Sequence, residues 1–189
     1  MIKGIIFDCF GVLYTNAQKT FFKKHENLFK EGESFLDRLN IEIDHGRISG
    51  SEFFRILERE TGISAEIIKK EMDDVIVSDQ QLVSLIHSLK RKYKIGLLSN
   101  AGEYEIEILY KEKLDELFDH ITISCRVGVI KPDPAIFYKC LEGLNLKPEE
   151  VLFIDDSKVN VDSSKSLGMK GFIYTDYPAF VDYLNKIKL

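Results

Sequence analysis

Cysteine is scarce in this chain, and its spacing matches neither a metal site nor a disulfide framework. Only three cysteines occur among the 189 residues, at Cys9, Cys125 and Cys140. The odd count leaves at least one thiol without a partner, and no two of them have the short spacing of a zinc-binding pair. We therefore expect reduced thiols, a cytoplasmic location and no zinc site.

Long basic clusters and long apolar runs are missing too. The net charge is −5, and the densest basic run, at residues 90–92, has the pattern of a solvated helix end. This charge pattern argues against a nucleic-acid or membrane partner. The first apolar stretch ends at Asp8 and is too short for a signal peptide or a membrane span. The sequence predicts one or two small domains and leaves the oligomeric state open.

Compact apolar runs separated by helical patterns indicate the fold. The composition of buried parallel strands is found at residues 5–7, 95–98, 121–123, 151–154 and 172–174. Between the third and fourth runs, Ile136, Cys140 and Leu144 follow helical spacing, with Asp133 as N-cap and Pro134 in the first turn. This alternation predicts an α/β protein with a doubly wound, Rossmann-like parallel sheet of about five strands.

A long helical segment interrupts this alternation after the first strand. Ser49 and Glu52 have the spacing of a capping box, Gly62 can end that helix, and Ser64 can begin the next. An apolar stripe at residues 82–89 indicates the helix that returns the chain to the sheet. We expect an α/β core domain of residues 1–14 and 88–189, and an inserted helical cap domain of residues 15–87.

Polar residues that can carry chemistry follow the predicted strands. Asp8, Ser99 and the pair Asp155-Asp156 each come directly after an apolar run, and Lys131 follows the loop after another. Because ligands of open parallel sheets bind outside the carboxyl ends of the strands, these side chains are expected at one edge. Carboxylates with a backbone carbonyl suit Mg²⁺, which bridges readily to a substrate phosphate.

This set of residues predicts phosphoryl transfer. Asp8 can attack phosphorus in line and form an acyl phosphate, while Lys131 holds the charged oxygens. Ser99 can donate its hydroxyl to a phosphate oxygen, and the backbone amides of Asn100 and Ala101 are expected as further donors where a helix begins. Such a reaction needs mainly positioning and charge stabilisation.

Four ordered motifs carry a resemblance to a known family. They are Phe7-Asp8-Cys9-Phe10-Gly11-Val12-Leu13, Leu98-Ser99-Asn100, Lys131-Pro132-Asp133-Pro134-Ala135-Ile136-Phe137 and Phe153-Ile154-Asp155-Asp156-Ser157. Together they resemble the haloacid dehalogenase-like hydrolase superfamily, in particular its phosphatases with a helical cap inserted after the first motif (subfamily I). The resemblance covers nearly the whole chain.

The resemblance implies a Mg²⁺-dependent phosphatase that acts on small phosphorylated metabolites. It implies that Asp8 is the nucleophile and that Ser99, Asn100 and Lys131 bind the phosphate. The metal ligands implied are Asp8, the backbone carbonyl of Phe10, and Asp156, with Asp155 and Asn160 as supporting groups.

Phe10 departs from the pattern of most of these phosphatases, which carry there an aspartate that protonates the leaving group and later activates water. Losing a general acid/base typically lowers the rate by about 10² to 10⁴. Good leaving groups are therefore favoured, sugar 1-phosphates among them. Members resembling glucose-1-phosphate phosphatases also lack this aspartate and share the Leu-Ser-Asn and Asp-Asp motifs.

Two alternatives stay open. An aromatic residue at the position of Phe10 is also found in 2-haloacid dehalogenases, although these use no metal and carry small neutral residues where this chain has Asp155-Asp156. Two such carboxylates would repel a carboxylate substrate. The other alternative is a regulatory protein that binds phosphate without turnover. His45, in a predicted cap loop beside Asp44, is a candidate for a substitute acid or a specificity contact.

Overall fold

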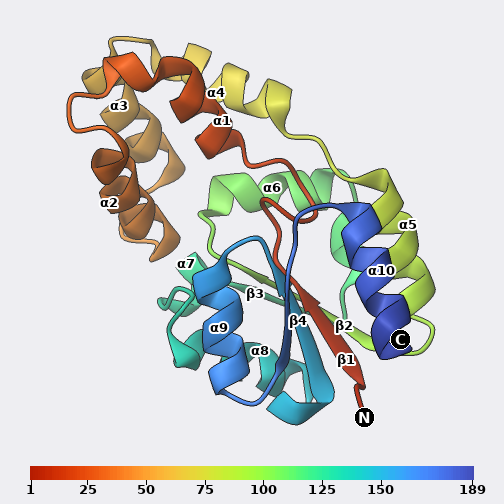
Figure 1. Ribbon diagram of the computed structural model, residues 1–189. Helices are drawn as coiled ribbons and strands as arrows, with labels where there is room; N and C mark the ends of the chain where they lie inside the picture. Colours follow the sequence, from red (N-terminus) through yellow and green to blue (C-terminus); the bar gives the residue numbers. More distant parts are fainter.

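A five-stranded parallel sheet forms the centre of the protein in the computed structural model, which describes residues 1–189 (Figure 1). The strand order is β3-β2-β1-β4-β5, and every neighbouring pair is parallel. The strands are β1 (Gly4–Phe7), β2 (Lys94–Ser99), β3 (His120–Ile123), β4 (Val151–Asp155) and β5 (Lys170–Ile173). The predicted doubly wound α/β fold is confirmed, and each of the five predicted strands is found.

The central strand β1 lies where the winding of the chain reverses. From β1 the chain builds the sheet outward through β2 and β3 on one side, then returns to add β4 and β5 on the other. The reversal therefore falls between β1 and β4, which run side by side from Gly4 opposite Val151 to Phe7 opposite Ile154. Ligands of doubly wound sheets bind beyond the carboxyl ends of the strands at such a point.

Helices cover both faces of the sheet. Alternate residues of a strand point to opposite faces, so Ile5 and Phe7 join one buried cluster while Ile6 joins the other. The first face is covered by α5 (Gln80–Leu89), α6 (Glu103–Lys111) and α10 (Tyr177–Ile187), the second by α8 (Pro134–Leu144) and α9 (Lys158–Ser166). All four residues of β1 are buried, which explains its continuous apolar run.

A third apolar cluster holds four helices together beyond the carboxyl ends of the strands (Figure 1). These helices are α1 (Ala17–His25), α2 (Glu33–Asp44), α3 (Gly50–Thr61) and α4 (Ala65–Val75), and we refer to them as the cap. Their shared core includes Phe21, Leu39, Phe53, Leu57 and Ile68. The remaining short helical turns are η1 (Glu26–Leu28), η2 (Leu114–Leu117), α7 (Ser124–Val127) and η3 (Pro148–Glu150).

The predicted helix ends of the cap are found, with one difference. Ser49 caps α3 by accepting a hydrogen bond from the backbone N–H of Glu52, and Gly62 ends the helix at φ +75°. The capping box is only half formed, because the Glu52 carboxylate pairs with Arg55 and Arg59 instead of reaching back to Ser49. These two guanidinium groups lie on the same helix face and compete for the carboxylate.

Helix α5 packs with the core and not with the cap. Its apolar side chains Leu82, Val83, Ile86 and Leu89 belong to the cluster that covers β1. The division into a core and a cap at residues 15–87 stays a proposal, and the packing of α5 favours an earlier cap end, before α5 begins. The two segments that cross to the cap are tied together, since Thr15 N–H donates to the Val77 carbonyl at 3.1 Å.

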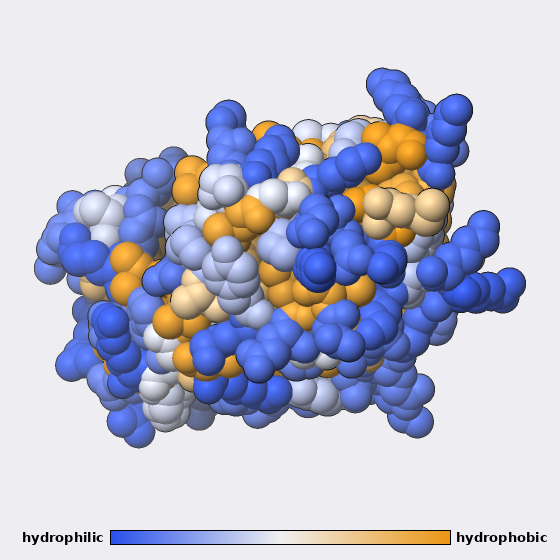
Figure 2. Space-filling model, turned by 90° about the horizontal axis from the view of Figure 1, so that it is seen from below, coloured by the Kyte–Doolittle hydropathy of each residue, from blue (hydrophilic) through white to orange (hydrophobic).

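The face of the core that lies opposite the cap is mainly hydrophilic, with smaller hydrophobic areas between the polar side chains (Figure 2). The buried apolar side chains are collected in the three clusters. None of the helices combines the length and the hydrophobicity that crossing a bilayer requires.

Candidate active site

Asp8 stands at the carboxyl end of β1, where the strand fixes its position. Its backbone N–H donates to the Ile154 carbonyl of β4 at 2.8 Å, and its Oδ1 accepts from the backbone N–H of Cys9 at 2.7 Å. The side chain is almost completely buried, while the neighbouring Cys9 belongs to the apolar core. Asp8 is thus a carboxylate presented at the reversal point of the sheet.

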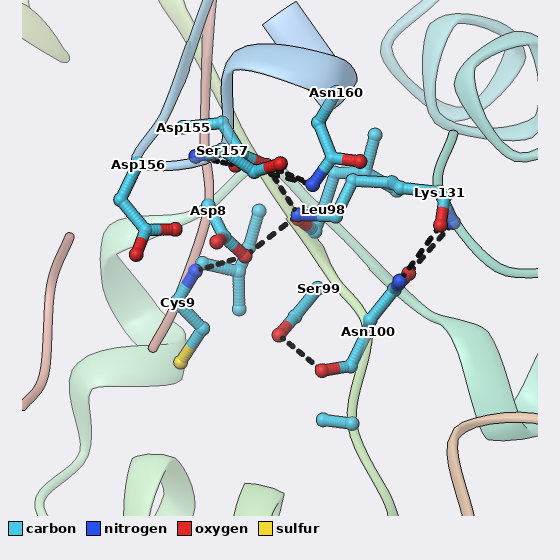
Figure 3. A network of polar contacts seen from close by, with 12 residues as sticks. Asp8, Cys9, Leu98, Ser99, Asn100, Lys131, Asp155, Asp156, Ser157 and Asn160 are labelled. Atoms are coloured by element: carbon cyan, nitrogen blue, oxygen red, sulfur yellow. Dashed lines mark hydrogen bonds and ion pairs between the residues drawn. The ribbon is translucent and has the colours of Figure 1, made fainter. Parts of the chain in front are cut away.

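Lys131 joins two carboxylates at the carboxyl ends of β1 and β4 (Figure 3). Its Nζ lies 2.7 Å from Asp8 Oδ1, 2.7 Å from Asp155 Oδ2 and 3.0 Å from the Leu98 carbonyl. Asn100 holds the lysine by its backbone, accepting from the Lys131 N–H at 2.7 Å and donating to its carbonyl at 3.0 Å. The predicted meeting of Asp8, Lys131 and Asp155 is therefore observed.

The two aspartates of the acidic pair have different surroundings. Asp155 is fully buried and saturated with donors, because Asn160 Nδ2 lies 3.1 Å from both of its oxygens and the Ser157 N–H lies 2.8 Å from Oδ1. Asp156 is half-buried, and its one ion pair is with Lys19 of α1 at 3.0 Å. Asp155 is thus placed to hold Lys131, while Asp156 keeps free oxygen lone pairs.

An oxygen-rich cluster suited to a divalent cation results. Oxygens of Asp8, Asp155 and Asp156 lie within 4.8 Å of one another. Gly11 leaves the necessary room, because its φ is +95° and a Cβ there would lie 2.6 Å from Asp156 Oδ2. Carboxylate oxygens are the ligands that Mg²⁺ takes in proteins, so the donor set fits this ion.

Charge and burial set the protonation of the central pair. Burial raises the pKa of Asp8 to about 7; the Lys131 charge opposes this shift and the Asp155 charge adds to it. Burial alone would lower the pKa of Lys131, but the charges of Asp8 and Asp155 outweigh it and raise that pKa. The site therefore contains a charged lysine that is shared between two buried carboxylates.

The second motif differs in part from its prediction. Ser99 is buried, and its Oγ makes only a long contact of 3.5 Å to the Asn100 carbonyl. The prediction that the Ala101 N–H donates to a phosphate is wrong. This N–H donates to Ser124 Oγ at 3.0 Å instead. Helix α6 begins only at Glu103. Ser124, which is distant in sequence, binds the backbone of Ala101, and the helix begins two residues later.

A cavity of about 190 Å³ adjoins Asp8 and lies between the core and the cap. Phe10 is its one hydrophobic lining residue. The cavity therefore has an apolar side chain at the position where most related phosphatases carry an aspartate. The cap contributes polar side chains only, namely Asn16, Gln18, Lys19, Asn40 and Asp44, and α6 contributes Glu105. Sequence reasoning did not assign these cap residues or Glu105 to the site, because only the docking of the cap decides which polar face of a helix is enclosed.

The predicted cap loop reaches the site, but through a different residue. His45 Nδ1 lies 3.1 Å from the Gly128 carbonyl, and the ring does not line the cavity. The neighbouring Asp44 does. The glycine two residues later could have indicated that the helix ends at Asp44, because Gly46 has φ +72° and lies in the tight turn after α2.

Comparison with known proteins places the chain in a family. The model of the haloacid dehalogenase-like hydrolases matches residues 2–168. D-ribitol-5-phosphate phosphatase of Bacteroides thetaiotaomicron is 27% identical over 91% of this chain and 91% of its own. The chain spans less than half of the length of several other curated relatives that it matches.

Solved structures share the fold over almost the full length. A predicted HAD-like family hydrolase from Porphyromonas gingivalis has a TM-score of 0.82 and 27% identity, covering 100% of this chain and 98% of its own. A HAD family enzyme of B. thetaiotaomicron, solved with magnesium and inorganic phosphate, has a TM-score of 0.78 and 25% identity, covering 95% of this chain and 99% of its own. With its four motifs gathered at one sheet edge, the chain belongs to the haloacid dehalogenase-like hydrolase family.

Proposed function

We propose that this hydrolase is a Mg²⁺-dependent phosphatase of small phosphorylated metabolites that works through a phosphorylated Asp8. The observation that carries the proposal is the buried Lys131, whose Nζ lies 2.7 Å from both Asp8 and Asp155 beside the oxygens of Asp156. A fixed cation beside a carboxylate and an oxygen-rich metal site is the arrangement that phosphoryl transfer needs. The magnesium and phosphate complex of the related B. thetaiotaomicron enzyme supports it.

The residues divide the reaction between them. Asp8 Oδ1 is held by Lys131 and the Cys9 N–H, so Oδ2 is the oxygen left to attack phosphorus. That attack forms the acyl phosphate and expels the leaving-group oxygen, and water then hydrolyses the acyl phosphate. Lys131 stabilises the charged phosphoryl oxygens throughout, and Ser99 donates its hydroxyl to one of them. Asp8, Asp156 and the Phe10 carbonyl would hold Mg²⁺, which supplies further neutralisation of the phosphoryl charge.

Asn160 and Asn100 act through other residues in this proposal. Asn160 donates to both oxygens of Asp155, and Asn100 fixes the backbone of Lys131. Both therefore keep the lysine aimed at Asp8. Asn100 thus acts on the phosphate mainly through Lys131, because both polar atoms of its amide are already engaged.

The cap side of the cavity indicates the chemistry of the leaving group. Amide groups of Asn16, Gln18 and Asn40 line it, and such groups bind hydroxyls by donating and accepting hydrogen bonds. Sugar and polyol phosphates fit this lining, and the relative that acts on ribitol 5-phosphate supports the class. Phe10 favours good leaving groups, so sugar 1-phosphates remain the preferred substrates within the class of sugar and polyol phosphates.

The two alternatives make different predictions. A 2-haloacid dehalogenase would release halide without a metal, although Asp156 and Asp155 disfavour a carboxylate substrate by repulsion. A regulatory protein would bind phosphate at Lys131 without turnover. The acidic surroundings of Asp8 favour phosphate chemistry over the dehalogenase, and turnover separates the phosphatase from the regulatory protein.

A screen of phosphorylated metabolites with Mg²⁺, including sugar 1-phosphates, polyol phosphates and an aryl phosphate, tests the proposal. We expect hydrolysis by the wild type, loss of hydrolysis after chelation of the metal, and no turnover by Asp8→Asn. Binding without turnover would favour the regulatory protein. Metal-independent release of halide from a 2-haloacid would overturn the phosphatase.

A further inference from the structure

The proposed phosphatase lacks a proton donor where most related enzymes have one, because Phe10 fills that position. An alkoxide leaving group needs a proton from some other group. We propose that Asp44, at the end of α2, donates that proton and then accepts one from the water that attacks the phosphorylated Asp8. This assignment rests on the proposed function and adds a catalytic residue to it.

The docking of the cap brings Asp44 to the cavity that adjoins Asp8. It lines the same cavity as Asp8, Lys131 and Phe10. As the last residue of α2 it belongs to the cap, whereas Asp8 and Lys131 belong to the core. A proton donor must face the nucleophile from the side of the leaving group, and this is the side on which the cap closes the cavity.

The turn after Asp44 is anchored to the core. His45 Nδ1 lies 3.1 Å from the Gly128 carbonyl. Gly46, at φ +72°, is pressed so closely against α7 that a Cβ would lie 2.7 Å from the Cys125 carbonyl oxygen. Two contacts directly after Asp44 thus fix its backbone against the core, which gives the side chain the defined position that proton transfer requires.

The surroundings of Asp44 suit a group that alternates between acid and base. Burial raises its pKa to about 7, the Lys131 charge partly opposes this shift, and no hydrogen bond contributes. Its place at the carboxyl end of α2 also disfavours the charged form, because that end of a helix is negative. A pKa near neutrality is the value at which one carboxyl group both donates and accepts a proton efficiently.

Glu105 is the rival carboxyl group in the cavity, and its contacts disfavour it. Its Oε1 accepts from Gln18 Nε2 and its Oε2 from the Gly102 N–H, both at 2.9 Å. The second contact caps α6, so Glu105 has a structural task at the helix start. Asp44 has neither constraint on its oxygens and is the better donor.

Each half-reaction moves one proton through Asp44. Asp8 Oδ2 forms a bond to phosphorus as the bond from phosphorus to the leaving oxygen breaks, and the Asp44 carboxyl proton moves to that oxygen to give an alcohol. In the second half, the Asp44 carboxylate takes a proton from water as the water oxygen bonds to phosphorus. The bond from Asp8 to phosphorus breaks, inorganic phosphate leaves, and Asp44 is again protonated.

Leaving groups that differ in their need for a proton test the assignment. Asp44→Asn keeps the shape of the side chain and removes its acidity, and it is compared with the wild type on ribitol 5-phosphate and on p-nitrophenyl phosphate. We expect kcat/KM for the alkyl phosphate to fall by about 10² to 10⁴. For the aryl phosphate, whose leaving group needs no proton, we expect kcat/KM within about threefold of the wild type.

The second half-reaction gives an independent readout. With p-nitrophenyl phosphate, Asp44→Asn is expected to release a burst of nitrophenol equal to the enzyme concentration, followed by slow turnover, because the acyl phosphate then lacks its base. Glu42→Gln is the matched control, since Glu42 lies on the same helix in an exposed ion pair with Arg47. It is expected to behave as the wild type on both substrates.

Rescue distinguishes a lost acid from a lost fold. Adding Phe10→Asp to Asp44→Asn should restore hydrolysis of the alkyl phosphate. Equal losses on both substrates, or no loss on either, would overturn the role of Asp44, and so would a selective loss in Glu105→Gln alone. A wild type that hydrolyses only aryl phosphate also overturns it and leaves the phosphatase intact, whereas a wild type inactive on every phosphate refutes the proposed function itself.

Discussion

Lys131 Nζ lies 2.7 Å from Asp8 Oδ1, and both side chains are at most one-tenth exposed. The lysine also lies 2.7 Å from Asp155 Oδ2. One buried cation thus balances two buried carboxylates. This relationship couples the stability of the core to the chemistry of the site.

Replacing Lys131 by methionine is expected to lower both the stability of the core and the activity of the site. The change leaves Asp8 and Asp155 buried without their counter-ion, and removing one partner of such a buried pair costs about 3 to 5 kcal/mol. The free energy of unfolding, measured by denaturant titration, should fall by this amount, and phosphatase activity should be lost. Lys139→Met, at an exposed position of α8, should change stability by less than about 0.5 kcal/mol. Equal stability of the two variants would contradict the coupling.

Gly11 is expected to control the affinity for Mg²⁺. A Cβ there would lie 2.6 Å from Asp156 Oδ2 and displace the carboxylate, so Gly11→Ala should raise the Mg²⁺ concentration for half-maximal activity by about tenfold or more. Gly62→Ala is the control, because Gly62 has a similar φ of +75° with no atom within 4 Å of a Cβ. Titration with Mg²⁺, followed by activity and by calorimetry, measures the difference. The same half-saturation in both variants would show that Asp156 does not hold the ion.

Glu105 is expected to make the stability depend on pH. Burial raises its pKa from 4.5 to about 8, and the Asp44 charge adds to the shift. Between these two values the folded protein binds more protons than the unfolded chain, so the free energy of unfolding falls as the pH rises. Glu105→Gln removes this slope of up to about 1.4 kcal/mol per pH unit, and Gln18 can turn its amide to keep the hydrogen bond.

Urea titrations of the wild type and Glu105→Gln across this pH range measure the effect. The stability of the wild type should fall relative to that of the variant as the pH rises from 4.5 towards 8. Parallel curves would mean that Glu105 has the same pKa in the folded and unfolded states.

Sequence reasoning located the core half of the site because parallel strands bring their carboxyl ends together. Asp8, Lys131 and Asp155 are far apart along the chain, yet each follows a strand or its loop, so the strand pattern was enough to group them. The strands themselves were visible as apolar runs because helices bury both faces of the sheet.

The cap half of the site was not accessible in the same way. Gln18, Asn40 and Asp44 have the spacing of ordinary polar helix faces, which are usually solvated, and only the docking of α1 and α2 over the sheet edge encloses them. A contact distant in sequence also explains the error at Ala101. Its N–H is taken by Ser124, a residue that no local pattern connects with it.

The most direct test of the proposed mechanism is to trap the phosphorylated Asp8. The wild type is mixed with Mg²⁺ and a substrate from the screen, quenched in acid within the first turnover, reduced with borohydride and digested for mass spectrometry. Because borohydride reduces an acyl phosphate to the alcohol, we expect homoserine at position 8 in the wild type and none in Asp8→Asn. Continued release of phosphate by the wild type with an unmodified Asp8 at every quench time would contradict it.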